Sequence, residues 1–283
     1  MSHSPNLIAL IDLAITEDLS GGDVTTDALF DGSEHSEAEL VGKEPLIFAG
    51  GPIFAYVFER IGGLPGSAGL ATVTLLVKEG EAVEKGRRLA SMQGPTTTLL
   101  KAERLGLNLL QRMCGVATQT RAFADALGPR AHITDTRKTT PGLRELERYA
   151  VRVGGGRNHR CNLGGGVLLK ENHLRAAGGI EPAIDAVRRA APHSLRIEVE
   201  VTTLAEVDQA LAAKADIIML DNMDIPTMEE AVRRIAHRAI IEVSGNVTLA
   251  RLPALRLLDV DFVSSGALTH SVKASDISML FKI

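Results

Sequence analysis

Six short apolar runs in the second half of the chain constrain its fold most strongly, because each ends in a polar or charged residue. Segments with helical periodicity separate the later runs. Strands that alternate with helices through short links predict parallel β-α-β units covered by helices. The runs lie at residues 133–135, 167–170, 197–200, 217–221, 240–244 and 262–265, and the helical segments at 181–191, 204–214, 227–238 and 249–257.

Six parallel strands predict an α/β barrel smaller than the eight-stranded form, with its chemistry at the carboxyl ends of the strands. Polar and charged side chains follow every one of the six predicted strands, which favours a functional site at this end of the barrel. These strand-end residues are Arg137, Lys138, Lys170, Glu200, Asp221, Ser244, Gly245, Ser265 and Gly266.

The first half of the chain has a different pattern. Residues 7–14 carry one apolar stripe and predict a helix, and the acid- and glycine-rich stretch 17–26 is interpreted as a loop. Short β runs at 38–42, 46–49, 72–77 and 88–94, with a helix at 52–61, predict an α/β sandwich. Two further helices are predicted at 98–113 and 118–127, with Arg104 on the polar side of the first.

Composition excludes several classes of protein. The 283 residues are 45% hydrophobic and carry a net charge of −4, so the chain can bury a large core and has no basic excess for nucleic acid. Cys114 and Cys161 show no disulfide or metal spacing and are predicted to be buried thiols in a reducing compartment. No signal peptide or membrane span is recognised, and we expect a cytoplasmic protein that binds no membrane.

The segment 135–173 holds the densest group of cationic residues. Arg137 with Lys138, and His159 with Arg160, flank an amphipathic helix that is predicted to start at Pro141 and Gly142 and to stop at 154–156. Lys170 ends the next strand. Two cationic loops that converge would hold the carboxylate or phosphate oxygens of a small polyanion.

The remaining strand ends add two further kinds of group. Glu200 and Asp221 suit sugar hydroxyls, or Mg²⁺ that itself carries phosphate oxygens. Backbone N–H groups of two strand-end turns can bind phosphate. These turns are formed by Ser244, Gly245 and Asn246 and by Ser265, Gly266 and Ala267. Such a pocket predicts an enzyme that acts on a sugar phosphate.

Several motifs, in order along nearly the whole chain, resemble the quinolinate phosphoribosyltransferase family. They are DTRKTTPG at 135–142, NHR at 158–160, KENH at 170–173, EVE at 198–200, LDN at 220–222, SGN at 244–246 and SGALTH at 265–270. Two positions depart from the family pattern: Gly165 stands where many bacterial relatives have Asp, and Asn246 where Gly is usual. Asn tolerates the left-handed backbone angles that Gly adopts.

The resemblance implies a type II phosphoribosyltransferase architecture, with an N-terminal α/β sandwich at 1–114, an open α/β barrel of about six strands at 115–268 and a C-terminal segment, 269–283, that returns to the N-terminal domain. It also implies Mg²⁺-dependent transfer of phosphoribose from phosphoribosyl pyrophosphate to quinolinate with loss of CO₂, a step of NAD synthesis. Glu200 and Asp221 would act on the metal indirectly, through Mg²⁺-bound pyrophosphate. Thr136 and His270 join the implied substrate-binding residues, and Arg104 would enter the partner's site across a homodimer; whether dimers form hexamers stays open.

Four alternatives remain open on the sequence alone. The nearest is a molybdenum-operon relative with another acceptor, which the KENH motif at 170–173 disfavours. Nicotinate phosphoribosyltransferase would leave part of the cationic set unused, since its acceptor has one carboxylate. The turn at 77–86 resembles a biotinyl or lipoyl carrier domain but lacks a lysine in a tight exposed hairpin. The last alternative is a non-catalytic barrel that only binds a metabolite.

Overall fold

The computed structural model describes residues 4–282, which form two compact units. The first unit contains the chain up to Gln119 together with Pro141–Gly154 and Val272–Ile283, and the second contains Thr120–Thr140 and Gly155–Ser271. The sequence-based division leaves residues 141–154 in the barrel domain, whereas the structure groups them with the first unit. Long-range contacts decide this grouping, and local periodicity carries no information about them.

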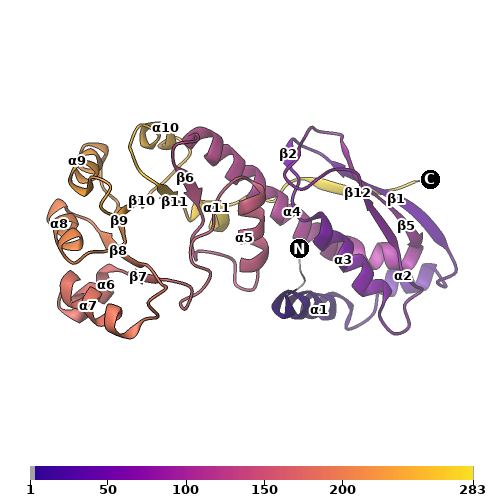
Figure 1. Ribbon diagram of the computed structural model, residues 1–283. Helices are drawn as coiled ribbons and strands as arrows, with labels where there is room; N and C mark the ends of the chain where they lie inside the picture. Colours follow the sequence, from indigo (N-terminus) through magenta and orange to yellow (C-terminus); the bar gives the residue numbers. More distant parts are fainter. Residues whose placement is uncertain (1–3, 283) are drawn as a thin grey trace. The chain divides into compact units, whose positions relative to one another are not determined.

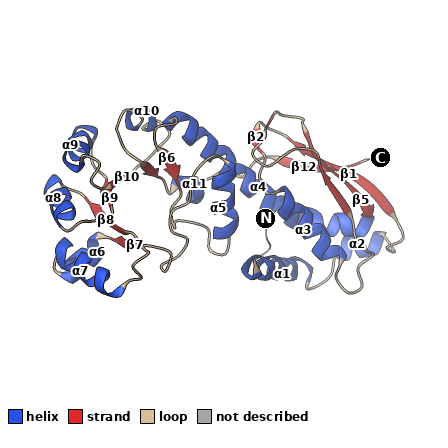
Figure 2. Cartoon of the chain, viewed as in Figure 1, coloured by secondary structure: helices blue, strands red, loops and turns tan. Residues whose placement is uncertain are grey.

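The first unit is built on an antiparallel sheet of four strands in the order β12-β1-β5-β3, which confirms the predicted α/β sandwich. Figure 2 shows α1, α2 and α3 on one side of these strands. Its strands are β1 (His35–Gly42), β2 (Leu46–Ile47), β3 (Thr72–Leu75), β4 (Ala82–Val83), β5 (Arg88–Pro95) and β12 (Ile277–Phe281). Its helices are α1 (Pro5–Leu19), α2 (Val24–Leu29), α3 (Gly51–Gly62), α5 (Arg144–Val153) and the first part of α4 (Thr96–Leu127).

Helix N-caps explain where α1 and α2 begin. The Ser4 hydroxyl accepts a hydrogen bond from the Leu7 amide, and Pro5 occupies the first position of α1, where no amide donor is needed. Asp23 caps α2 in the same way through the Thr26 amide. The prediction of a loop over 17–26 is therefore wrong at both ends. Helix α1 continues to Leu19, and the Asp23 side chain starts a helix too short for periodicity to reveal.

The carboxylate of Glu79 caps α3 from a distant part of the chain. It accepts hydrogen bonds from the amides of Gly50 and Gly51 and from the Tyr149 hydroxyl at 2.8 Å. Burial, and then the bond to Glu79, raise the pKa of Tyr149. The turn at 77–86, which resembles that of a carrier domain, thus serves here to hold a helix N-terminus.

Helix α4 is continuous from Thr96 to Leu127, although the sequence pattern predicts a break between 113 and 118. Gly115 lies in that interval, and a Cβ atom there would collide with the carbonyl oxygen of Lys273. The glycine therefore permits a close approach of the chain to the helix rather than ending the helix. A small residue inside a helix is ambiguous in sequence for this reason.

Helix α5 begins later than the sequence predicts. Pro141 and Gly142 form a turn, Gly142 has a φ of +83°, and Leu143 is the N-cap. On its buried face, Glu147 is fully buried and accepts two hydrogen bonds from the Arg112 guanidinium, at 3.0 and 2.6 Å. Arg112 also donates to the Val272 carbonyl at 3.1 Å, so one arginine joins three segments of the first unit.

The second unit is an open barrel of six parallel strands in the order β6-β11-β10-β9-β8-β7, which confirms the predicted architecture. Figure 1 shows helices α7 to α10 on the outer side of these strands. The strands are β6 (His132–Thr134), β7 (Val167–Leu169), β8 (Ile197–Val201), β9 (Ile217–Asp221), β10 (Ile240–Ser244) and β11 (Phe262–Ser264). The helices are α6 (Glu171–Ala177), α7 (Ile180–Ala190), α8 (Leu204–Ala212), α9 (Ile225–Ile235), α10 (Leu252–Leu255) and α11 (Ala267–His270).

Alternation along the strands separates the helix-facing core from the barrel interior. Val199, Ile218, Leu220 and Val243 have no exposed surface and pack away from the polar residues that alternate with them. The strands are in parallel register, with Glu200 opposite Met219 and Asp221 opposite Ser244. Parallel strands place their carboxyl ends at one edge, and this edge carries the site described next.

Candidate active site

A cavity of about 620 Å³ lies at the carboxyl ends of the barrel strands. Most of its described lining consists of residues that the sequence predicts for the site, with a small group that it does not. The predicted residues are Thr136, Arg137, Lys138, His159, Arg160, Lys170, Glu200, Asp221, Ser244, Gly245 and Asn246. The others are Leu168, Met219, Asn222, Glu242 and Ser264.

The loop after β6 is fixed from both sides. The Lys138 amide donates to the Thr136 hydroxyl at 3.1 Å, and the Lys138 carbonyl accepts a hydrogen bond from Thr269 at 2.8 Å. A Cβ atom on Gly266 would lie 2.8 Å from the Lys138 side chain, so only glycine leaves room for the lysine. The segment 265–270 therefore supports Lys138 instead of lining the cavity.

A second loop runs beside the end of β6 and presents His159 and Arg160. Arg157 donates to the Ile133 carbonyl, and its own carbonyl accepts from the Asp135 amide, which extends the sheet by one residue. The fully buried Asp135 carboxylate accepts hydrogen bonds from Asn158 Nδ2 at 2.5 Å and from the His159 amide at 2.8 Å. The motif residues Asp135 and Asn158 thus hold the loop, while its next two residues face the cavity.

His159 meets two buried glutamates inside the barrel. Its Nε2 atom lies 3.0 Å from Glu198 Oε2 and 3.8 Å from Glu242 Oε1. Burial alone would lower the pKa of His159, but the Glu198 hydrogen bond and the two carboxylates together raise it. Burial, with the nearby Glu198 charge, also raises the pKa of Glu242 to about 7. Both shifts favour the protonated forms of His159 and Glu242.

The ligand atoms of His159, Glu198 and Glu242 all lie within 4.8 Å of one another, a spacing that could hold a metal ion. Imidazole and carboxylate are suitable ligands for several divalent cations. The direct hydrogen bond between His159 and Glu198 already uses one ligand atom of each. We therefore interpret His159 and Glu198 as a hydrogen-bonded pair, with the charge of Glu242 close by.

Arg160 is the most buried arginine beside the cavity. One of its terminal nitrogens donates to the Gly166 carbonyl at 3.0 Å, and its Nε atom is buried without a hydrogen-bond partner. Burial and the positive charge of Arg137 lower the pKa of Arg160, which still leaves an arginine charged at neutral pH. A cation with an unsatisfied donor is poised to bind an anionic group.

Lys170 and two carboxylates form the opposite part of the lining. Lys170 Nζ lies 3.7 Å from Glu200 Oε2, and its amide donates to His173 Nδ1 at 3.0 Å at the start of α6. Burial raises the pKa of Glu200, Lys170 opposes that shift, and Asp221 adds to it. Glu200 and Asp221 are therefore close enough to influence each other, as a shared ligand would require.

The turn after β10 brings backbone groups to the cavity. Gly245 and Asn246 both have left-handed backbone angles, with φ of +84° and +50°. A Cβ atom on Gly245 would collide with the Asn222 side chain, whose Oδ1 accepts a hydrogen bond from Asn246 Nδ2 at 3.0 Å. The structure thus confirms that Asn246 adopts the left-handed conformation that glycine usually provides.

Five of the predicted site residues are not among the described residues that line this cavity: Arg104, Ser265, Gly266, Ala267 and His270. Arg104 is an exposed residue of α4 in the first unit. Ala267 begins α11, and His270 ends it. Cys161, predicted to be buried, is exposed, whereas Cys114 is buried as predicted. Cys161 follows the cavity loop at 157–160, and a position on a loop favours exposure.

Most of the residues that sequence reasoning missed share one position in the pattern. Leu168, Glu198, Met219 and Glu242 each lie two residues before a strand-end residue that was predicted. Since side chains in a strand alternate, residues two apart point to the same face. Alternation counted backwards from Lys170, Glu200, Asp221 and Ser244 would have identified this deeper layer.

The fold and the cavity define a barrel enzyme that binds a small polyanion at its strand ends, and the comparisons agree. The family model "Quinolinate phosphoribosyl transferase, N-terminal domain" matches residues 23–114, and that of the C-terminal domain matches 116–280. The chain therefore belongs to the quinolinate phosphoribosyl transferase family.

Individual relatives match over nearly the whole length. A "probable nicotinate-nucleotide pyrophosphorylase [carboxylating]" of Bacillus subtilis is 42% identical over 99% of this chain and 94% of its own. The solved structure of NadC from Streptococcus pyogenes is 40% identical, covers 99% of this chain and 97% of its own, and superposes with a TM-score of 0.93. A nicotinate-nucleotide pyrophosphorylase from Francisella tularensis is 35% identical over 99% and 98%, with a TM-score of 0.91.

Proposed function

We propose that this protein transfers phosphoribose from phosphoribosyl pyrophosphate to quinolinate with loss of CO₂, which yields nicotinate mononucleotide and pyrophosphate. The observation that carries the proposal is the convergence of five cationic side chains with the carboxylates of Glu200 and Asp221 in one cavity at the strand ends. Family membership and the names of full-length relatives support this reaction over the alternatives of another acceptor or a non-catalytic barrel.

The cations suit an acceptor with two carboxylates. Arg137 and Arg160 can form paired hydrogen bonds with carboxylate oxygens, and His159 lies between them and the barrel interior. Leu168 and Met219 provide apolar surface beside these groups, suited to a flat pyridine ring. An acceptor with one carboxylate would leave part of this positive charge unpaired.

The remaining groups suit the phosphoribosyl donor. As pyrophosphate leaves, positive charge develops at C1 of the ribose, and Glu200 and Asp221 can stabilise it. Lys138 and Lys170 can neutralise the departing pyrophosphate, and the turn at Ser244 can bind phosphate through its backbone. The pyridine nitrogen forms the new bond to C1. The adjacent carboxylate then leaves as CO₂, because the alkylated nitrogen stabilises the electron pair left on the ring carbon, which takes up a proton.

We expect Mg²⁺ as the cofactor. Glu200 and Asp221 are hard oxygen ligands that line the cavity together, which is the donor chemistry Mg²⁺ prefers. These residues would act on the metal indirectly, through the pyrophosphate group it carries. When bound, Mg²⁺ would neutralise part of the pyrophosphate charge.

We also propose a homodimer in which Arg104 completes the partner's site, with hexamer formation left open. Arg104 is exposed on α4, which supports this proposal. Its segment also resembles the one by which the enzymes of this family lend an arginine across the dimer. Arg104→Ala and Lys170→Ala should each be nearly inactive alone. After subunit exchange, a mixed dimer would carry one site with both defects and one with neither, and should recover up to about half of wild-type activity. No recovery after verified exchange would place Arg104 outside the partner's site.

Among residues 4–282 no helix combines the length and the apolar character needed to cross a membrane. We propose that the enzyme works in the cytoplasm, with quinolinate and phosphoribosyl pyrophosphate as its partners and without nucleic acid or membrane. Two free cysteines fit a reducing compartment. Fractionation of cells that express the tagged protein would test this location.

The direct test of the reaction compares two acceptors. The purified protein is incubated with phosphoribosyl pyrophosphate, Mg²⁺ and either quinolinate or nicotinate, and CO₂ and nicotinate mononucleotide are measured. We expect turnover of quinolinate and none of nicotinate, since the second carboxylate pairs with the additional cations. Equal turnover of the two acceptors would contradict the assignment of those cations.

A further inference from the structure

We propose that Glu198 and Glu242 are positioning residues that hold the His159 imidazole, and through it Arg160, against the cavity. This inference rests on the proposed function, because it assigns His159 and Arg160 to the acceptor. Neither glutamate belongs to the set of residues that the proposed reaction uses. Both are 4% exposed, so their carboxylates are buried in the barrel.

The two ring nitrogens of His159 have different neighbours. Nδ1 accepts a hydrogen bond from the Arg160 amide at 2.7 Å, and Nε2 lies 3.0 Å from Glu198 Oε2. A backbone amide is always a donor, so in the neutral ring Nδ1 lacks a proton and Nε2 carries it. The Arg160 amide therefore sets the tautomer of the ring, and Glu198, which accepts the Nε2 hydrogen, fixes its orientation.

Three parts of the barrel fix this residue. Glu198 comes from β8 and Glu242 from β10, while the buried Asp135, next to β6, accepts a hydrogen bond from the His159 amide at 2.8 Å. Glu242 Oε1 lies 3.8 Å from Nε2, too far for a hydrogen bond, and acts on the ring through its charge. Hydrogen bonds to both the backbone and the ring leave His159 little freedom, whereas a histidine held at one point can rotate.

The position of His159 determines that of Arg160. The Arg160 amide donates its hydrogen bond to the imidazole, and the Arg160 guanidinium donates to the Gly166 carbonyl at 3.0 Å. His159, Arg160 and Glu242 line both the strand-end cavity and a second cavity of about 410 Å³, where Glu198 also lies. The cluster thus forms a wall between two hollow spaces, where packing alone would not keep the side chains in place.

Unpaired polar atoms in this wall favour a role beyond stability. Glu198 Oε1 and Glu242 Oε1 are buried without a hydrogen-bond partner, and such unpaired groups lower the stability of a fold. Buried carboxylates that only filled space would be replaced by apolar residues at a gain in stability. Their presence is accounted for if they orient groups that bind substrate.

The experiment is a double-mutant cycle with Glu198→Leu and His159→Phe, measured with both substrates. We expect Glu198→Leu to raise KM for quinolinate on the order of 10- to 100-fold, the range for losing a partner that orients a histidine. KM for phosphoribosyl pyrophosphate should change by less than about twofold, since the donor groups do not depend on this ring. The double mutant should be no worse than His159→Phe, because Glu198 acts only through His159.

Two further variants separate positioning from folding. Glu198→Gln keeps an oxygen that can accept the Nε2 hydrogen and should restore most of the quinolinate affinity. Glu230→Gln removes an exposed ion-paired glutamate of α9 and should leave both KM values unchanged. Equal increases of both KM values, or additive losses in the double mutant, would show that Glu198 is merely structural.

A readout that does not need activity keeps the test independent of the proposed function. ¹⁵N NMR of the wild-type imidazole should show, in its neutral form, a protonated Nε2 and a bare Nδ1 for His159, and Glu198→Leu should shift the Nε2 resonance, because its hydrogen then has no acceptor. Wild-type protein that shows this pattern but does not convert quinolinate and phosphoribosyl pyrophosphate would refute the proposed function. The positioning of His159 by the two glutamates would then still stand. Two results would contradict the positioning of His159: a mixture of tautomers in the wild-type protein, or tight Zn²⁺ or Mn²⁺ binding that is lost in Glu198→Gln.

Discussion

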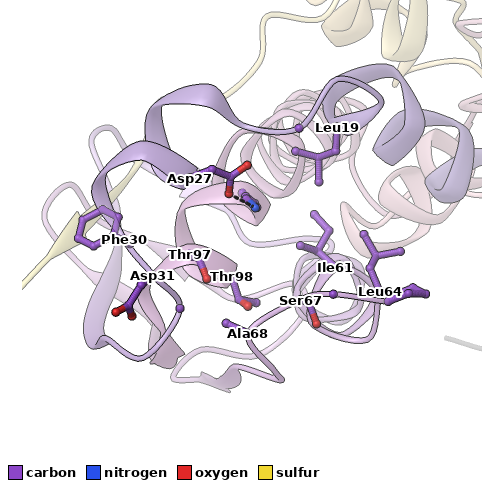
Figure 3. Close-up of a pocket in the computed structure, with 15 residues that line it drawn as sticks. Leu19, Asp27, Phe30, Asp31, Ile61, Leu64, Ser67, Ala68, Thr97 and Thr98 are labelled. Carbon is purple, nitrogen blue, oxygen red and sulfur yellow. Dashed lines mark hydrogen bonds and ion pairs between the residues drawn. The ribbon is translucent and has the colours of Figure 1, made fainter.

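The two units of this protein use charged side chains differently. In the first unit, Arg112 joins Glu147 to Val272, Glu79 caps α3, and Lys101 pairs with Asp27 at 2.6 Å. In the second unit, the charges at the strand ends face an open cavity. The first unit also has a cavity, of about 380 Å³, but the Asp27 carboxylate within it is held in its ion pair, as Figure 3 shows.

A cavity therefore indicates a function only when the partners of its charged groups are also known. The cavity of the first unit is walled by Ile61, Leu64 and Phe30, and its one lysine already has a partner. The strand-end cavity gathers Arg137, Lys138, Arg160 and Lys170 within one lining. Like charges held together raise the energy of the protein without ligand, and a polyanion relieves that cost.

The strongest test of this comparison removes lysines of the two cavities one at a time. Lys138→Ala and Lys170→Ala should each lower kcat/KM on the order of 10²- to 10³-fold, as expected for one preorganised charge that stabilises the transition state. Lys101→Ala, the matched change in the first unit, should alter kcat/KM by less than about twofold, since exposed ion pairs contribute little. Steady-state kinetics and thermal melting of the three variants check this.

Melting temperatures decide what a loss of activity means. The Lys138 and Lys170 variants should melt close to wild type, since their side chains are on loops and at a strand end rather than in the core. A parallel loss of activity and of melting temperature would make these lysines structural. A large loss of kcat/KM in Lys101→Ala would remove the distinction between the two cavities.

The second prediction concerns the buried charges of the first unit. Glu147→Gln should lower the free energy of unfolding by about 1.5–3 kcal/mol, the range for a hydrogen bond to a charged group. In this variant a neutral amide replaces the fully buried carboxylate, so the charge of Arg112 is no longer balanced there. Arg112 is also bonded to Val272. Urea denaturation measures the change, and the folded variant should retain wild-type KM for both substrates. A stable variant with a raised KM would give this pair a role in the site.

The sequence predicted the strands and the strand-end groups well, for a physical reason. Buried parallel strands are mainly apolar, so residues such as Ile217 and Ile240 mark the beginnings of strands, and a polar residue such as Asp221 or Ser244 marks the end. Short helices were missed because periodicity needs more than one or two turns. Helix α2 has six residues and α6 has seven.

The deeper layer of the site was missed for a different reason. Glu198 and Glu242 interrupt apolar strands, and a charge inside a strand has no local meaning until its neighbours across the barrel are known. His159 could be identified from its loop, but its two glutamates come from strands about 40 and 80 residues further along the chain. Which pairs meet is decided by strand order, a property of topology that a single sequence does not display.

The last prediction concerns the pH dependence of Glu242. Burial beside Glu198 raises the pKa of Glu242 from 4.5 to about 7 in the folded protein, while the unfolded chain keeps the ordinary value. Between these values the folded state binds more protons than the unfolded state, so this group makes stability fall as pH rises from about 4.5 to about 7. The penalty is complete above that range and absent below it.

Glu242→Gln should remove this penalty without adding a charge. The melting temperature of the variant relative to wild type should therefore increase steadily from pH 4.5 to pH 7 and then level off. Comparison of the two proteins cancels the titration of other groups, apart from His159. The pKa of His159 is raised less when the neighbouring carboxylate of Glu242 is removed. That change acts above pH 6.5 and in the same direction, since less stability is then lost as the ring loses its proton. A constant difference across this range would show that Glu242 keeps its charge at all these pH values, and that the barrel interior tolerates a second carboxylate beside Glu198.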